Sequence, residues 1–303
     1  MSKALKDKIL QLKKERQAII LAHYYQIPEI QEIADAVGDS YNLSKIAQGC
    51  SEQVVMFCGV RFMAESAKIL SPEKTILLPA ANAGCPMADM AAYEDLLELQ
   101  KEHPNAATVS YINSSTEVKA ISDVCVTSSS ATKIIENLNV DEIIFLPDKN
   151  LGGYIAEQFP NKKFIFWNGY CVVHSRISPE DVLKMKDKIK DIVVLVHPEC
   201  EAPVRKLADF IGSTGEIIKH ATESSSNNFL IVTEEGVIHQ LKKHNPDKNF
   251  YIPGEGMTCV NMKKTTLKNV YEGLLNMQHQ IEIDEEIRIK AYNALNNMHK
   301  LSR

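Results

Sequence analysis

Apolar runs alternate with amphipathic, helix-length stretches along most of the chain. The apolar runs, among them IIFL, FIFW and VVLV, are continuous and are not interrupted by polar residues at every second position. Such continuity is typical of parallel strands that are buried on both faces, because helices cover both sides of a parallel sheet. The pattern therefore predicts an α/β protein in which short strands and helices alternate.

One succession of features occurs three times. Each copy begins with a strand that ends in a polar residue, continues to a hydroxyl-rich turn that opens a helix, and then has a second apolar strand. A third strand follows and ends in a Gly-bearing turn and a cysteine. Corresponding positions lie 86 or 88 residues apart. The strand-end residues are His23, Tyr111 and His197, the turns contain Ser40, Ser128, and Ser213 with Thr214, and the cysteines are Cys85, Cys171 and Cys259.

The repeat predicts three similar three-layer α/β/α domains with parallel sheets, arranged around a pseudo-threefold axis. We expect the domains to span residues 1–85, 86–171 and 172–260, and the helical tail 261–303 to pack back on the first. A loosely similar strand-helix period would explain one matched spacing. It explains less well four features that recur three times in the same order.

Composition argues against nucleic acid and membranes as partners of this chain. With 45% apolar residues and a net charge of -5, the 303-residue chain can form a sizeable core but has no basic face for nucleic acid. The apolar runs are much shorter than the roughly 20 residues of a membrane helix. The first residues alternate charged residues with Leu and Ile and lack the apolar core of a secretory signal. We expect a cytoplasmic protein without a nucleic-acid or membrane partner.

The seven cysteines are odd in number and form no CxxC pair, which argues against a disulfide framework and a zinc ribbon. Ligands of α/β sheets bind beyond the carboxyl ends of the strands, so the three repeated cysteines should meet near one point. Three thiolates can hold zinc, or a 4Fe-4S cluster with one open iron. Soft ligands without a clear histidine partner favour iron-sulfur, and zinc is the alternative. The cysteines outside the repeated turn, predicted to be packing residues, are Cys50, Cys58, Cys125 and Cys200.

The hydroxyl turns and several acid-base candidates should surround the same point. Free N–H groups at helix N-termini suit phosphate or carboxylate, although Ser and Thr at such turns are often only caps. His197 and Glu199 alternate on one strand end and so face the same side, as an acid-base pair or as a structural ion pair. The candidates are His23, Tyr25, Tyr111, Asn113, His174, His197 and Glu199.

Taken together, these motifs resemble a known family. The segments LAHYYQ, VGDS, NAGCPMAD, YINSSTEVKA, CVTSSSA, FLPDKNLG, WNGYCVVH, VHPEC, ADFIGST and PGEGMTCVNMK are similar to those of quinolinate synthase, the A-type enzyme of NAD biosynthesis. The resemblance extends from about residue 20 to residue 270.

The resemblance implies three α/β/α domains around a 4Fe-4S cluster held by Cys85, Cys171 and Cys259. The activity it implies is condensation of iminoaspartate with dihydroxyacetone phosphate to quinolinate, phosphate and water, with L-aspartate oxidase as supplier of iminoaspartate. The positions that match substrate carboxylate and phosphate sites are His23, Ser40, Ser128, Ser213 and Thr214. The positions that match the acid-base and positioning set are Tyr25, Tyr111, Asn113, His174, His197 and Glu199, of which Tyr25, Tyr111, His197 and Glu199 are expected to be catalytic.

Two other functions fit the same residues. The first is a zinc hydrolase or lyase that uses the three cysteines as ligands and Glu199 as base. The second is a non-catalytic sensor of anionic metabolites, in which the thiols only pack. Iron and sulfide content distinguishes the first from an iron-sulfur enzyme, and replacement of Cys171 distinguishes the second.

Overall fold

The computed structural model of the chain describes residues 2–302, and within that range the main strands form three four-stranded parallel sheets. The α/β prediction with three similar parallel-sheet units is confirmed. We call the sheets, with their helices, the first, second and third units. Their strands are β1 (Ala18–His23), β2 (Ala36–Gly38), β3 (Val54–Cys58) and β4 (Thr75–Leu77); β5 (Ala107–Tyr111), β6 (Val124–Val126), β7 (Glu142–Leu146) and β8 (Lys163–Phe166); and β9 (Val193–Val196), β10 (Phe210–Ile211), β11 (Asn228–Val232) and β12 (Asn249–Tyr251).

All three sheets have the same topology. Their strand orders are β2-β1-β3-β4, β6-β5-β7-β8 and β10-β9-β11-β12, so each sheet repeats the previous one four strands later. Residues at the centre of the sheets are buried: all five residues of β3 are buried, and so are the last four of β7 and β11. The continuous apolar runs of the sequence are therefore the central strands.

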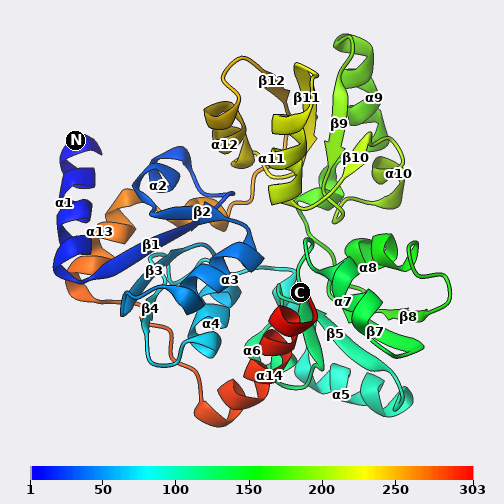
Figure 1. Cartoon of the computed structure of the whole chain (residues 1–303), viewed down its shortest axis with the longest axis horizontal. Coiled ribbons are helices and arrows are strands. Elements are labelled where there is room, and N and C mark those ends of the chain that lie inside the picture. Colours follow the sequence, from blue (N-terminus) through cyan, green and yellow to red (C-terminus); the bar gives the residue numbers. More distant parts are fainter. Residues whose placement is uncertain (1, 303) are drawn as a thin grey trace.

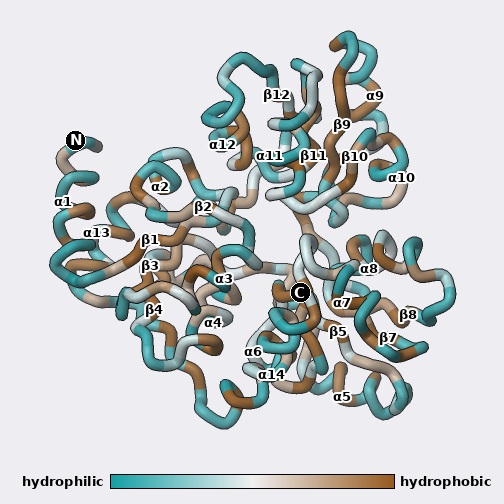
Figure 2. The backbone as a smooth tube through the Cα atoms, in the orientation of Figure 1, coloured by the Kyte–Doolittle hydropathy of each residue, from teal (hydrophilic) through white to brown (hydrophobic). Residues whose placement is uncertain are grey.

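Helices follow the strands and cover both faces of each sheet. The tube in Figure 2 is brown along most strands and alternates brown and teal along the helices, as expected for amphipathic covers. The helices are α1 (Ser2–Glu15), α2 (Pro28–Ile33), α3 (Ser40–Gly49), α4 (Arg61–Leu70), α5 (Tyr93–Glu102), α6 (Thr116–Ala120), α7 (Ala131–Asn137), α8 (Lys149–Ala156), α9 (Pro179–Lys188), α10 (Ala202–Arg205), α11 (Thr214–Glu223), α12 (Val237–His244), α13 (Leu267–Asn276) and α14 (Glu285–Leu301). Not one of the helices within residues 2–302 is long and apolar enough to cross a membrane.

The units surround a common centre, to which the strands of each sheet lead (Figure 1). The two C-terminal helices, α13 and α14, pack on different units. Helix α13 packs on α1 and β3 of the first unit. Helix α14 lies against α6 and β6 of the second unit and against α4 of the first, so the tail joins two units and does not cover the first alone.

Candidate active site

A cavity lies at the centre, where the carboxyl ends of strands from all three units meet. His23 and Tyr111 are the last residues of β1 and β5, and His197 follows β9 directly. Of the residues predicted for the site, Ser213 alone does not line this cavity, because its hydroxyl caps α11 and accepts a hydrogen bond from the Glu216 N–H. The predicted residues that do line it are His23, Tyr25, Ser40, Cys85, Tyr111, Asn113, Ser128, Cys171, His174, His197, Glu199, Thr214 and Cys259.

The three cysteines occupy structurally equivalent turns. In each unit a short 3-10 helix begins three residues after the cysteine: η1 (Ala88–Met90), η2 (His174–Arg176) or η3 (Met262–Lys264). The cysteine carbonyl accepts the N–H of the residue four positions later, at 3.3 Å for Cys85, 3.0 Å for Cys171 and 3.2 Å for Cys259. In each turn the N–H group at the start of the 3-10 helix, that of Ala88, His174 or Met262, acts to lower the pKa of the cysteine thiol. Each thiol therefore faces the donor end of a helical turn.

The cavity does not favour bare thiolates. Burial raises the pKa of Cys85 to about 12, and negative charge on Cys259 and Glu199 adds to the shift, against the opposing N–H of Ala88. Burial and the Glu199 carboxylate raise the pKa of Cys171 well above its ordinary value. A bound cationic group would offset both the burial and the neighbouring negative charge that disfavour the thiolates. Three such thiols around one cavity therefore fit a metal centre.

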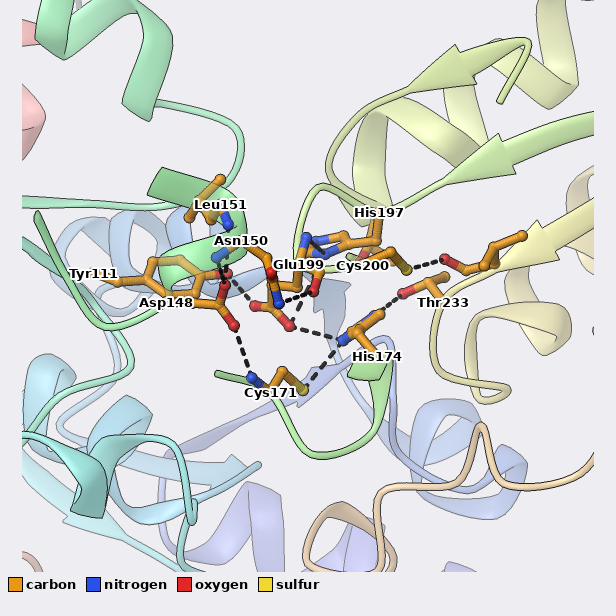
Figure 3. A network of polar contacts seen from close by, with 12 residues as sticks. Tyr111, Asp148, Asn150, Leu151, Cys171, His174, His197, Glu199, Cys200 and Thr233 are labelled. Atoms are coloured by element: carbon orange, nitrogen blue, oxygen red, sulfur yellow. Dashed lines mark hydrogen bonds and ion pairs between the residues drawn. The ribbon is translucent and has the colours of Figure 1, made fainter. Parts of the chain in front are cut away.

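Glu199 is the centre of a buried hydrogen-bond network (Figure 3). The Tyr111 hydroxyl donates to Glu199 Oε1 at 2.7 Å, and His174 Nδ1 lies 2.8 Å from Oε2. The same His174 Nδ1 is 3.1 Å from Cys171 Sγ. Burial disfavours the carboxylate, but the neighbouring imidazoles of His174 and His197, together with the hydrogen bonds from His174 and Tyr111, outweigh burial and hold the pKa of Glu199 below its ordinary value. The site thus contains an ionised carboxylate.

His23 and His197 are neutral donors. The Tyr25 N–H donates to His23 Nδ1 at 3.1 Å, and the Glu199 N–H donates to His197 Nδ1 at 3.3 Å. Because Nδ1 accepts in both rings, these contacts assign the proton of each to Nε2. Burial lowers the pKa of both imidazoles to about 3. Each ring can therefore donate a hydrogen bond to an anionic ligand at neutral pH without carrying charge.

The neutral state of His23 predicts a pH dependence of stability. Its folded pKa of about 3 lies below the ordinary 6.5, so between these values the unfolded chain binds a proton that the folded chain does not. Stability should therefore fall as pH decreases from about 6.5 towards 3. Replacing His23 by Asn, which keeps an acceptor for the Tyr25 N–H, should flatten urea-unfolding free energy against pH by about 1.4 kcal/mol per pH unit.

The same measurement on the metal-free full-length chain carrying His244→Asn is the control. His244 ends α12 and is exposed, so its replacement should leave the slope unchanged. A His23→Asn protein with the slope of the unchanged chain would show that His23 is protonated when folded.

Sequence reasoning missed three residues that support the site. Thr233 Oγ1 lies 2.8 Å from the Tyr25 hydroxyl and 2.9 Å from His174 Nε2, and so connects these two side chains. Asp148 and Glu234 accept hydrogen bonds from the backbone N–H of Cys171 and Cys259. The two acids lie 86 residues apart in the sequence, the spacing of the repeat, and this was the available signal.

The chain is similar over almost its whole length to proteins of one family. The family model described as Quinolinate synthetase A protein matches residues 7–300. A quinolinate synthase of Clostridium perfringens (strain SM101 / Type A) is 63% identical over 98% of this chain and 99% of its own length. That of Clostridioides difficile (strain 630) is 61% identical over 100% of this chain and 99% of its own, and that of Clostridium acetobutylicum is 55% identical over 100% of both. The protein is therefore an enzyme that belongs to the quinolinate synthetase A family.

Proposed function

We propose that the chain condenses iminoaspartate with dihydroxyacetone phosphate to form quinolinate, phosphate and water, with a 4Fe-4S cluster bound by Cys85, Cys171 and Cys259. The relatives named quinolinate synthase support the reaction. The observation that carries the proposal is the cavity itself, since three equivalent cysteine turns from three units line it together with Glu199.

The ligand set supports a cluster over a zinc ion. Three cysteines on equivalent turns line the cavity, and soft thiolate ligands suit an iron-sulfur centre. Among residues 2–302, Cys171, His174 and Glu199 form a group whose ligand atoms all lie within 4.8 Å of one another, so a metal centre held by Cys171 would have an imidazole and a carboxylate beside it.

Anionic groups of both substrates can be held by the donors that line the cavity. Ser40 and Thr214 are the first residues of α3 and α11, where free N–H groups and the helix dipole favour carboxylate or phosphate. His23 and His197 add neutral Nε2–H donors. These donors explain how a chain of net charge -5 binds acidic substrates.

Proton transfer is assigned to the network around Glu199. Its carboxylate accepts a proton from substrate carbon at Oε1 or Oε2, and the Tyr111 hydroxyl bonded to Oε1 donates towards a departing oxygen. His174, fixed between Glu199 and Thr233, orients the carboxylate. When bound, the cluster supplies an open iron that acts as a Lewis acid.

The reaction is tested with anaerobically purified protein. L-aspartate, L-aspartate oxidase and fumarate as its two-electron acceptor generate iminoaspartate in the assay, and dihydroxyacetone phosphate is added. We expect quinolinate and phosphate in equal amounts, and a brown protein that contains iron and acid-labile sulfide at about four each per chain. Omission of either substrate is the control and should abolish both products.

Other outcomes would contradict separate parts of the proposal. A colourless protein with tightly bound zinc would indicate a zinc hydrolase or lyase. A brown protein that binds both substrates without forming quinolinate would support the proposed cluster and contradict the proposed reaction.

A further inference from the structure

The third strand of each unit, β3, β7 or β11, ends beside the cysteine turn of the same unit. In all three units a backbone N–H just beyond this strand donates to the carbonyl two residues before the cysteine, at 2.8, 2.8 and 2.9 Å. The turns are thus attached to the sheets in the same way. The donor and acceptor pairs are Arg61 with Ala83, Lys149 with Gly169, and Glu235 with Met257.

The residue just before each of these donors differs between the units. The second and third units have Asp148 and Glu234 at this position, whereas the first has Val60. The Cys171 N–H donates to Asp148 Oδ2 at 2.7 Å, and the Cys259 N–H donates to Glu234 Oε1 at 2.9 Å. Val60 has no oxygen in its side chain and cannot accept from Cys85.

Each carboxylate also binds a second part of its unit. Asp148 Oδ1 accepts the N–H groups of Asn150 and Leu151 at 2.7 and 3.0 Å, so the residue connects the start of α8 to the cysteine turn (Figure 3). Glu234 Oε2 accepts the Gly236 N–H at 2.8 Å. Both acids are fully buried. An acceptor removed from such a place would leave a partly buried N–H without a partner, which is costly.

The backbone is closely packed around both contacts. A Cβ on Gly169 would lie 2.8 Å from Pro147 Cβ, so the cysteine turn approaches the strand end as closely as a glycine allows. A Cβ on Gly236 would lie 2.8 Å from backbone atoms of Tyr25 and 2.9 Å from Glu234 Oε2. Little space is therefore left for the Cys171 turn, or for the strand end that carries Glu234, to shift and regain a lost hydrogen bond.

We propose that Asp148 and Glu234 are positioning residues that hold the main chain of Cys171 and Cys259 in the metal-binding conformation before the metal is present. The inference rests on the proposed function only in that these cysteines bind a metal group. Cys85, whose unit has Val60, lacks this support, so the three ligands are not equally preorganised.

Asp148→Asn is the sharpest test, because the change is nearly isosteric. The amide oxygen can still accept the N–H groups of Asn150 and Leu151, but the amide NH₂ then faces the Cys171 N–H, and two donors meet. In the metal-free full-length protein, hydrogen exchange of the Cys171 amide should become at least about tenfold faster, since its N–H loses its acceptor and faces a second donor. The Cys85 and Cys259 amides should exchange as before. In the loaded protein, release of iron to a chelator should accelerate by at least about tenfold.

Asp284→Asn is the matched control, because Asp284 caps α14 through the N–H groups of Glu286 and Ile287 and lies outside the cysteine turns. It should change neither exchange at the cysteines nor iron release. If Asp148→Asn does not fold, Glu234→Gln becomes the test of the proposal, and the faster hydrogen exchange is then expected at the Cys259 amide. Unchanged Cys171 exchange or unchanged iron release in a folded Asp148→Asn protein overturns the proposal. Since neither readout is turnover, a protein that binds iron but forms no quinolinate would contradict the proposed reaction alone.

Discussion

Replacing Glu199 by Gln should reduce quinolinate formation by about 10²- to 10⁴-fold, the usual contribution of a positioned acid-base group. The amide cannot accept a proton from substrate. It also cannot accept from both neighbours, because Tyr111 and His174 each contact one carboxylate oxygen, at 2.7 and 2.8 Å, and the NH₂ group would replace one of these acceptors. The effect should appear in kcat, since the interaction is required in the transition state.

The measurement is quinolinate production under anaerobic conditions, normalised to iron content so that loss of the metal is not mistaken for loss of the base. Glu201→Gln is the matched control, because Glu201 follows two residues later in the chain and is exposed. It should keep full activity. A Glu199→Gln protein with normal iron content and a kcat within about threefold of the unchanged enzyme would show that Glu199 is not the acid-base group.

The fold could be predicted from the sequence because its signals are local and repeated. Continuous apolar strands, the 86- or 88-residue spacing and the Gly-bearing turns before Cys85, Cys171 and Cys259 each follow from short-range constraints on buried parallel strands. The identical strand orders of the three sheets are what this repetition requires. The convergence of strand ends then brings the predicted residues other than Ser213 to one cavity.

The remaining features depend on tertiary contacts that leave little trace in one sequence. A search for features present in all three repeats passes over Asp148 and Glu234, because the first unit has Val60 at the same place. Thr233 is one threonine after a strand, and only the folded chain shows that it joins Tyr25 to His174. The amphipathic pattern of α14 indicates a buried face but not its partners, which lie in two different units.

Cysteine chemistry gives the second large prediction. Cys171→Ala should lose most of the bound iron and sulfide and all measurable quinolinate formation, because two thiolates would not hold the proposed cluster. The fold should remain, since the turn keeps its backbone bonds through the Asp148 carboxylate and the Cys171 carbonyl. Iron, sulfide and turnover are measured on the same preparation, with far-UV circular dichroism as the test of folding.

Cys50→Ala is the control that distinguishes loss of a metal ligand from loss of any cysteine thiol. Cys50 is half-buried like Cys171, but it follows α3, outside the repeated turns, and its sulfur contacts Lys74 Nζ at 3.0 Å. Its replacement should leave the iron content and turnover unchanged. A non-catalytic sensor would instead bind anionic metabolites equally well with or without the Cys171 thiol. If Cys171→Ala retained iron, sulfide and quinolinate formation, the three turns would only pack around the cavity, and the metal centre would have to lie elsewhere in the chain.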